Sequence, residues 1–161
     1  MGERNCGNGN KRNEILSLVL TVLWIAFIFS NSLQDGELSG ERSGRLLALI
    51  NGLLEGSDIR LSEFVLRKMA HFGEFMVLGL FLFFTWKGWA RNYGNRYLIA
   101  AVGSGFFVAC SDECLQLFSE GRAGRLMDVG IDTAGCAVGV LVCMLYMCMK
   151  NVKARSGNER P

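Results

Sequence analysis

The second apolar run of the chain, at residues 64–86, reads FVLRKMAHFGEFMVLGLFLFFTW. It is long enough to cross a bilayer as one helix, since a span needs about 20 mostly apolar residues. Its first half also carries four ionisable side chains, which are Arg67, Lys68, His71 and Glu74. At spacings of three and four residues, these side chains share one face of a helix. The run therefore predicts a membrane helix that is polar on one face, at one end.

Three further apolar runs have the length of a span and lie at residues 15–33, 97–118 and 127–149. Half of the 161 residues are apolar and only 20% are charged, which excludes a disordered chain. The net charge of +2 provides no basic surface for nucleic acid, so no nucleic-acid partner is expected. The first run has the basic start and small-x-small end of a signal peptide, but three spans follow it. We therefore expect an all-α membrane protein, a bundle of four transmembrane helices.

The domain organisation follows from these spans. We expect one membrane domain over residues 14–149, between a polar N-terminal tail at 1–13 and a polar C-terminal tail at 150–161. The longest loop, residues 34–63, has apolar positions around Ile50 whose spacing gives a helix one apolar face. This short helix is expected either at the outer membrane surface or packed against the rim of the bundle.

The distribution of Lys and Arg predicts the orientation. The two tails and residues 87–96 contain ten of these residues, whereas the loops at 34–63 and 119–126 contain five. Cytoplasmic loops carry the excess of Lys and Arg, so both termini are expected to be cytoplasmic. We expect a multi-pass protein of a bacterial-type cytoplasmic membrane, with its functional face outside the cytoplasm.

Polar residues accumulate in the outer half of all four spans. A charged side chain near a bilayer centre costs roughly 2.5–3.5 kcal/mol, and buried ion pairs rarely add stability over apolar packing. A water-accessible polar pocket explains the accumulation better than a set of structural ion pairs. The residues expected in it are Ser30, Gln34, Arg67, Lys68, His71, Glu74, Asp112, Glu113, Gln116, Arg122, Arg125, Asp128 and Asp132.

Four motifs within these segments resemble those of the VanZ-like membrane proteins. They are FSNSLQ at 29–34, RKMAHFGEF at 67–75, SDECLQLFSEGR at 111–122 and DVGIDTAG at 128–135. The sequence departs from the family's usual pattern at Asp132, where the family more often has Asn, and at Phe75, where it often has Tyr. The resemblance implies a protein of the cell envelope, because the family's namesake is associated with resistance to the lipoglycopeptide teicoplanin.

The first candidate function is the binding of an amphiphile. Arg and Lys side chains near the outer surface suit the phosphate groups of lipid headgroups. The expected partner is a membrane lipid, a lipid-linked wall precursor or a lipoglycopeptide, and such binding would lower susceptibility to teicoplanin-like antibiotics. The ligand-binding residues are expected to be Ser30, Gln34, Arg67, Lys68, Gln116, Arg122, Arg125, Asp128 and Asp132.

The second candidate function is catalysis on an envelope lipid or wall precursor. The acid–base groups of this enzyme would be His71, Glu74, Asp112 and Glu113. The same region offers a set of residues for a divalent ion: His71, Glu74, Asp112 and Asp128. However, H-x-x-E lacks the specificity of the metalloprotease motif H-E-x-x-H. We therefore expect neither a metal nor another cofactor.

Small side chains in the spans indicate close packing. Gly135 and Gly139 form a G-x-x-x-G pattern, which lets two helices approach closely. The contact is expected either inside the bundle or in a homodimer. None of the six cysteines forms a C-x-x-C pair, so neither a zinc site nor a thioredoxin-like site is indicated. The cysteines in apolar runs are expected to pack between helices.

Overall fold

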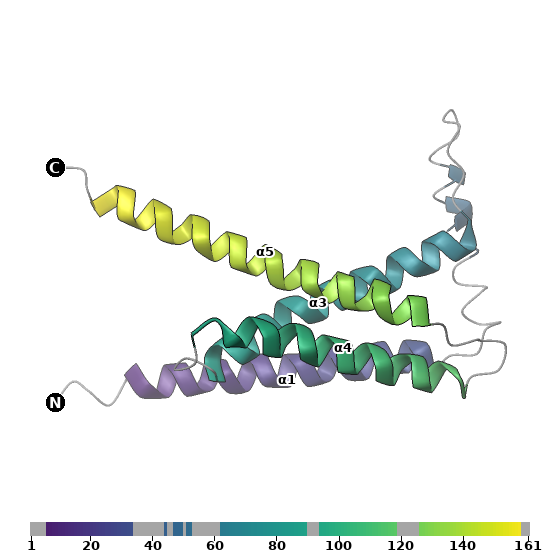
Figure 1. The fold of residues 1–161 in the computed structure, drawn as a ribbon, viewed down its shortest axis with the longest axis horizontal. Coiled ribbons are helices and arrows are strands. Elements are labelled where there is room, and N and C mark those ends of the chain that lie inside the picture. The colour runs from purple at the N-terminus through teal and green to yellow at the C-terminus, as the bar shows by residue number, and fades with distance from the viewer. Residues whose placement is uncertain are drawn as a thin grey trace.

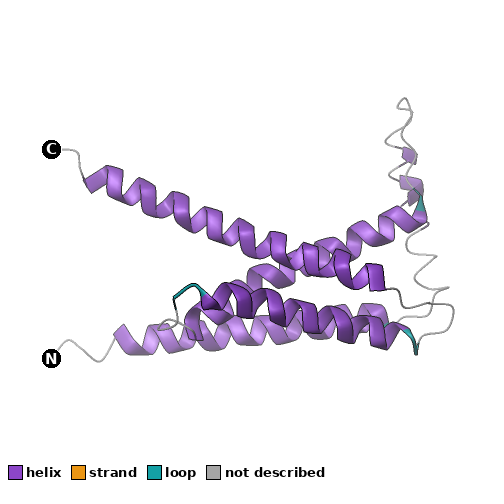
Figure 2. Ribbon diagram, viewed as in Figure 1, coloured by secondary structure: helices purple, strands orange, loops and turns teal. Residues whose placement is uncertain are grey.

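Four long helices make up the fold of the computed structural model. The structure describes residues 6–33, 44, 47–49, 51–52, 62–89, 94–118 and 126–158. The helices are α1 (Cys6–Ser32), α3 (Glu63–Trp89), α4 (Arg96–Gln116) and α5 (Leu126–Asn158) (Figure 1). Figure 2 shows that helix accounts for most of the described residues. Each helix contains a segment long and apolar enough to cross a membrane, which confirms the expected all-helical fold with four candidate spans.

The helices extend beyond the apolar runs. α1 begins at Cys6, before the predicted span that starts at Ile15, and α5 continues past Met149 to Asn158. A helix satisfies its backbone hydrogen bonds internally, so it continues into polar sequence where nothing breaks it. The only proline of the chain is Pro161, so no helix contains one.

The second apolar run forms the central helix. α3 packs against α1, α4 and α5, and Phe75, Leu78 and Phe83 on it are fully buried. Residues of the other three helices belong to the same core, such as Ile28 of α1, Ala109 of α4 and Cys136 of α5. α3 therefore lies at the middle of the core, in contact with each of the other three helices.

α3 and α5 approach closely at the G-x-x-x-G pattern. A Cβ atom added at Gly135 would meet the backbone oxygen of Phe72, and one added at Gly139 would meet that of Met76. Gly79 of α3 lies against the backbone of α5 in the same way. The pattern therefore serves a contact within the chain, one of the two alternatives. A homodimer through Gly135 and Gly139 would require α3 to move away from this face of α5. The homodimer stays a prediction.

Cysteines contribute to the same interior. Cys136 and Cys143 are buried in the core, whereas Cys114 and Cys148 are exposed. The free thiols are those of Cys110, Cys114, Cys136, Cys143 and Cys148. The expected packing between helices therefore holds for the two buried ones.

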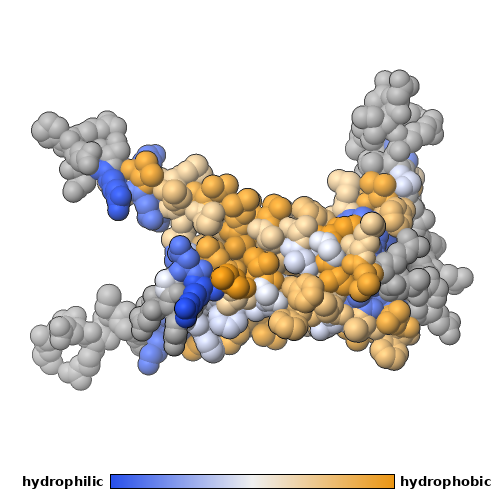
Figure 3. All heavy atoms as spheres, viewed as in Figure 1, coloured by the Kyte–Doolittle hydropathy of each residue, from blue (hydrophilic) through white to orange (hydrophobic). Residues whose placement is uncertain are grey.

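The outer surface of the bundle is apolar. Large hydrophobic side chains such as Leu23, Ile99, Phe107 and Leu145 are exposed. Figure 3 shows hydrophobic residues over the middle of the visible face and hydrophilic residues towards its ends. Soluble proteins seldom expose so much contiguous apolar surface, whereas a bilayer favours it. Together with the four candidate spans, this surface is that of a multi-pass membrane protein.

The helices alternate in direction, so that all four motifs come to one end of the bundle. α1 and α4 finish there, and α3 and α5 begin there (Figure 1). We call this end the motif end. The loop helix expected around Ile50 falls largely outside the described residues. The cytoplasmic location of the termini, which would put the motif end outside, stays a prediction.

Candidate functional site

Polar side chains from all four helices fill the interior of the motif end. Five of them are buried: Ser32, Asp112, Glu113, Gln116 and Asp132. We call the whole group the polar cluster, and its members are Asn31, Ser32, Lys68, His71, Glu74, Asp112, Glu113, Gln116, Asp128 and Asp132. The members on each helix recur at three- and four-residue spacings or are adjacent, so each helix turns one side to the cluster.

Two side chains of α1 hold Glu74 of α3. Asn31 Nδ2 donates a hydrogen bond to Glu74 Oε1 at 2.9 Å. Trp24 Nε1 donates to the backbone oxygen of Glu74, also at 2.9 Å. Trp24 and Asn31 are two helical turns apart and therefore share a face of α1. Glu74 is thus positioned through both its carboxylate and its backbone.

Gln116 connects α4 to α1. Its Nε2 donates to Asp112 Oδ2 at 2.9 Å and lies 3.5 Å from Ser32 Oγ. Asp112 and Ser32 have no exposed surface. The amide therefore orients one oxygen of the Asp112 carboxylate, and it does so in the interior of the protein.

Lys68 connects α3 to α5 at the edge of the cluster. Its Nζ forms an ion pair with Asp128, and both side chains keep some solvent exposure, at 19% and 13%. The same Nζ lies 5.4 Å from the ring centroid of Phe64. Beside the pair is a groove of about 380 Å³, which we call the motif-end groove. It is lined by Phe64, Val65, Lys68, Met69, Phe72 and Ile131.

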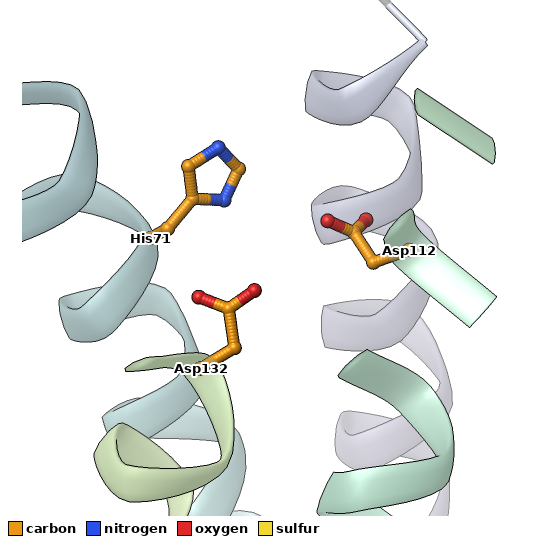
Figure 4. A group of neighbouring side chains, drawn as sticks. All are labelled: His71, Asp112 and Asp132. Atoms are coloured by element: carbon orange, nitrogen blue, oxygen red, sulfur yellow. The ribbon is translucent and has the colours of Figure 1, made fainter. Parts of the chain in front are cut away.

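The centre of the cluster is formed by His71, Asp112 and Asp132. Each contributes one nitrogen or oxygen atom, and the three atoms lie within 4.8 Å of one another. The residues come from α3, α4 and α5, and Figure 4 shows their side chains directed towards a common space. His71 Nδ1 also lies 3.9 Å from Glu74 Oε2. An imidazole and two carboxylates so close together are able to hold a cation or exchange a proton.

The structure brings together most of the residues expected in the pocket. Those on α3, α4 and α5 form the cluster, with Arg67 half-buried nearby on α3. Ser30 lies on the exposed side of α1 and is not brought to the cluster. Gln34, Arg122 and Arg125 lie outside the described residues.

Sequence reasoning missed three contributors from α1: Trp24, Asn31 and Ser32. The sequence does contain a pattern that indicates the inward face of α1, because Trp24, Ile28 and Asn31 recur at spacings of four and three residues. Ile28 is fully buried, so this spacing follows the inward face of the helix. Small polar residues near a helix end occur on either face, however, and the run Ser30-Asn31-Ser32 does not by itself indicate which member turns inward.

A comparison with models of known protein families gives a match over most of the chain. The family model described as VanZ/LLP1 matches residues 17–147. The chain belongs to the VanZ/LLP1 family. The match begins within α1, ends within α5 and includes every member of the polar cluster, and it confirms the resemblance carried by the four motifs. No curated protein and no solved structure matches the chain.

In this VanZ/LLP1 chain, one of the two departures that the resemblance indicates lies at the centre of the polar cluster. Asp132, where the resemblance leads one to expect Asn, is 2% exposed and faces His71 and Asp112 (Figure 4). The departure thus adds a carboxylate where the three helices meet. The second departure, Phe75, is fully buried in the core and leaves the charge of the cluster unchanged.

Proposed function

We propose that this VanZ/LLP1 protein binds the headgroup of an envelope amphiphile at the motif end, from the outer leaflet. The observation that carries the proposal is the position of Lys68 and Asp128 between the motif-end groove and the interior of the cluster. An amphiphile needs a polar site and an apolar surface side by side, and these residues lie where the two meet.

The lining of the motif-end groove supports the apolar half of this proposal. Phe64, Met69 and Phe72 of α3 and Ile131 of α5 offer apolar surface on which a hydrocarbon chain is able to lie. Burying such a chain contributes about 0.8 kcal/mol per CH₂ group. A groove open at the surface of a membrane helix pair also lets a lipid enter sideways, without passing through water.

The charges at the rim support the polar half. Lys68 is paired with Asp128, but both remain partly exposed, so an incoming phosphate is able to replace the carboxylate as the partner of the ammonium group. Arg67 lies on the same helix turn, and Arg122 and Arg125 are expected in the adjoining loop. The ligand class is accordingly a membrane lipid, a lipid-linked wall precursor or a lipoglycopeptide.

The side of the membrane follows from the Lys and Arg distribution. With both termini cytoplasmic, the motif end faces the outer leaflet, where occupancy of the site would reduce susceptibility to teicoplanin-like antibiotics. A fluorescent protein fused after Pro161 should fluoresce, and a periplasm-dependent phosphatase fused there should be inactive. An active phosphatase would invert the orientation and remove the outer-leaflet site.

Lipid retention tests the binding function directly. The full chain is purified in mild detergent, incubated with a total envelope lipid extract, and examined by native mass spectrometry. We expect the wild type to retain an anionic amphiphile and Lys68→Gln to lose it. Lys87→Gln is the matched control, because Lys87 is a cation of the same helix at the opposite end. Equal retention by the two variants, or no retention by the wild type, would contradict the proposal.

The alternative function is an enzyme that modifies an envelope lipid or wall precursor. It is favoured by the proximity of His71 Nδ1 and Glu74 Oε2, which lie 3.9 Å apart. This is longer than a hydrogen bond, and a side-chain movement of about 1 Å would let the carboxylate orient the imidazole as a general base. Asp112 and Glu113 would supply further acid–base groups. Envelope extracts from cells with and without expression distinguish the two functions. A new or missing lipid species indicates an enzyme, whereas unchanged lipids with a bound amphiphile indicate a binding protein.

A further inference from the structure

The His71, Asp112 and Asp132 side chains form a set of potential metal ligands. One imidazole nitrogen and two carboxylate oxygens, each from a different helix, lie within 4.8 Å of one another. A point between three such atoms is at most about 2.8 Å from each, and zinc bonds to nitrogen and oxygen measure about 2.0–2.2 Å. Side-chain rotations that move each atom by about 0.7 Å would therefore bring all three atoms into bonding distance.

Asp132 provides a second and independent observation. Its side chain is 2% exposed and points into the space between the other two (Figure 4). Within the described part of the chain, its carboxylate makes neither a hydrogen bond nor an ion pair. Buried charges in proteins are paired or coordinate metals, because an uncompensated carboxylate is costly away from water. A bound cation is the compensation that this geometry allows.

The charges around Asp132 point the same way. Asp112, Asp128 and Glu113 are close enough to interact electrostatically with it, and Lys68 is the one cation in that set. Lys68 is already paired with Asp128. Among the groups that act on Asp132 in this way, three carboxylates stand against one ammonium group, and a divalent cation would offset this excess around Asp132.

We propose that His71, Asp112 and Asp132 bind one divalent metal ion of the Mn²⁺ or Zn²⁺ type. An imidazole suits zinc and its neighbours, carboxylates suit manganese and magnesium, and the mixed set favours an ion that accepts both. This reverses the sequence-based expectation that no metal is bound. It also corrects the ligand set, because Glu74 is held by Asn31 and Asp128 by Lys68, whereas Asp132 faces the centre.

Gln116 would act as a positioning residue for this ion. Metal-bound carboxylates are usually hydrogen-bonded in turn, and the Gln116 amide already donates to Asp112 Oδ2 at 2.9 Å. Three protein ligands leave coordination positions open for water or for the phosphate of a headgroup. This last consequence rests on the proposed function, whereas the metal site itself does not.

Metal content tests the inference. The full chain is purified in detergent, stripped with a chelator, and equilibrated with Mn²⁺ alone or Zn²⁺ alone before elemental analysis. We expect about one ion per chain in the wild type, and an affinity roughly 100-fold weaker or worse in Asp132→Asn and His71→Gln, because changing even a supporting residue typically costs 10–100-fold. Gln116→Ala should weaken binding by roughly 10–100-fold.

Glu14→Gln is the matched control. It changes one carboxylate to an amide at the opposite end of the bundle, and should keep the wild-type affinity for the ion. Helical circular dichroism and gel-filtration profiles show that each variant is folded, and His71→Gln keeps the test decisive if Asp132→Asn does not fold. The inference is overturned if the wild type binds neither ion stoichiometrically, or if Glu14→Gln loses the ion as Asp132→Asn does.

The same samples separate this inference from the proposed function. Bound amphiphile is measured by mass spectrometry beside the metal content. A protein that binds metal and retains no lipid supports the metal site and contradicts the headgroup proposal. A protein that retains lipid after complete removal of metal, and never binds the ion, overturns the metal site alone.

Discussion

The two ends of the bundle bury polar side chains in different ways. Towards the end away from the motifs, Thr21 Oγ1 and Thr85 Oγ1 lie 2.9 Å apart between α1 and α3. Trp86 Nε1 donates to Ser104 Oγ at 3.0 Å between α3 and α4. These groups are neutral, and each pair joins two helices. The motif end instead gathers ionisable side chains from three helices around one centre, with neutral hydrogen-bonding groups of α1 beside them.

The larger groove is at the other end. A groove of about 630 Å³ lies between α1 and α3, against about 380 Å³ for the motif-end groove. Its lining is mostly apolar, with Leu16, Leu20 and Phe84 among its members, and Glu14 and Lys87 supply its charges. Cavity volume alone would therefore direct attention to the end away from the motifs. The concentration of charge distinguishes the motif end, because charge is what a bilayer makes costly.

The largest expected effect is the loss of function at the motif end. His71→Ala, Glu74→Gln and Asp112→Asn should each lower the affinity for the amphiphile by roughly 100-fold or more, as the loss of a buried charged group does. Their amounts in the membrane should stay at the wild-type level. Glu14→Gln, an acid-to-amide change at the other end, should retain binding. If the three variants instead disappear from the membrane, the cluster is a set of structural ion pairs.

The next effect concerns stability. Lys68→Met leaves Asp128 without its cation and should lower the free energy of unfolding by about 1–3 kcal/mol, less than a fully buried pair because both groups are partly exposed. The double variant Lys68→Met/Asp128→Leu should recover most of this loss, since apolar residues replace buried ion pairs without penalty. Amphiphile binding should be absent in both variants. Thermal unfolding in detergent, read beside lipid retention, measures the two effects. Recovery of binding in the double variant would show that the pair has only a structural role.

A smaller effect is expected in cells. Protection should be stronger against glycopeptides that carry a fatty-acyl chain than against those without one, because an acyl tail brings the drug to the outer leaflet beside the site. The difference should be at least about fourfold, the equivalent of one CH₂ group at about 0.8 kcal/mol. Inhibitory concentrations for paired acylated and non-acylated glycopeptides, with wild type and Glu74→Gln, decide this. Equal protection against both would contradict a membrane-located site.

The smallest effect is at the opposite end. Thr21→Val removes one partner of the hydrogen bond to Thr85 and should cost only about 0.6 kcal/mol, the average for such bonds between membrane helices. Metal content and lipid retention should not change. A loss of bound metal or of bound lipid would show that the two ends are coupled, and would contradict the division into a structural end and a functional end.

Much of the fold was predictable from the sequence. Residues 64–86 and the three other apolar runs are long enough to span a bilayer, and a membrane leaves the backbone few alternatives to helix. Alternation of direction then brings the four motifs to one end without further information. The polar faces of α3, α4 and α5 followed from spacing, because residues three or four apart share a side of a helix.

The sequence by itself therefore determined the helices, their polar faces and the end at which those faces meet. The tertiary structure alone decided that Asn31 and Ser32 rather than Ser30 turn inward, since each residue rotates the face of α1 by about 100°. It also decided which carboxylate reaches the centre. Gly135 and Gly139 seat α5 against the backbone of α3, and this register places Asp128 beside Lys68 and Asp132 beside His71. The spacing of residues along one helix does not predict which carboxylate reaches the centre, because that depends on how far α5 is shifted along α3.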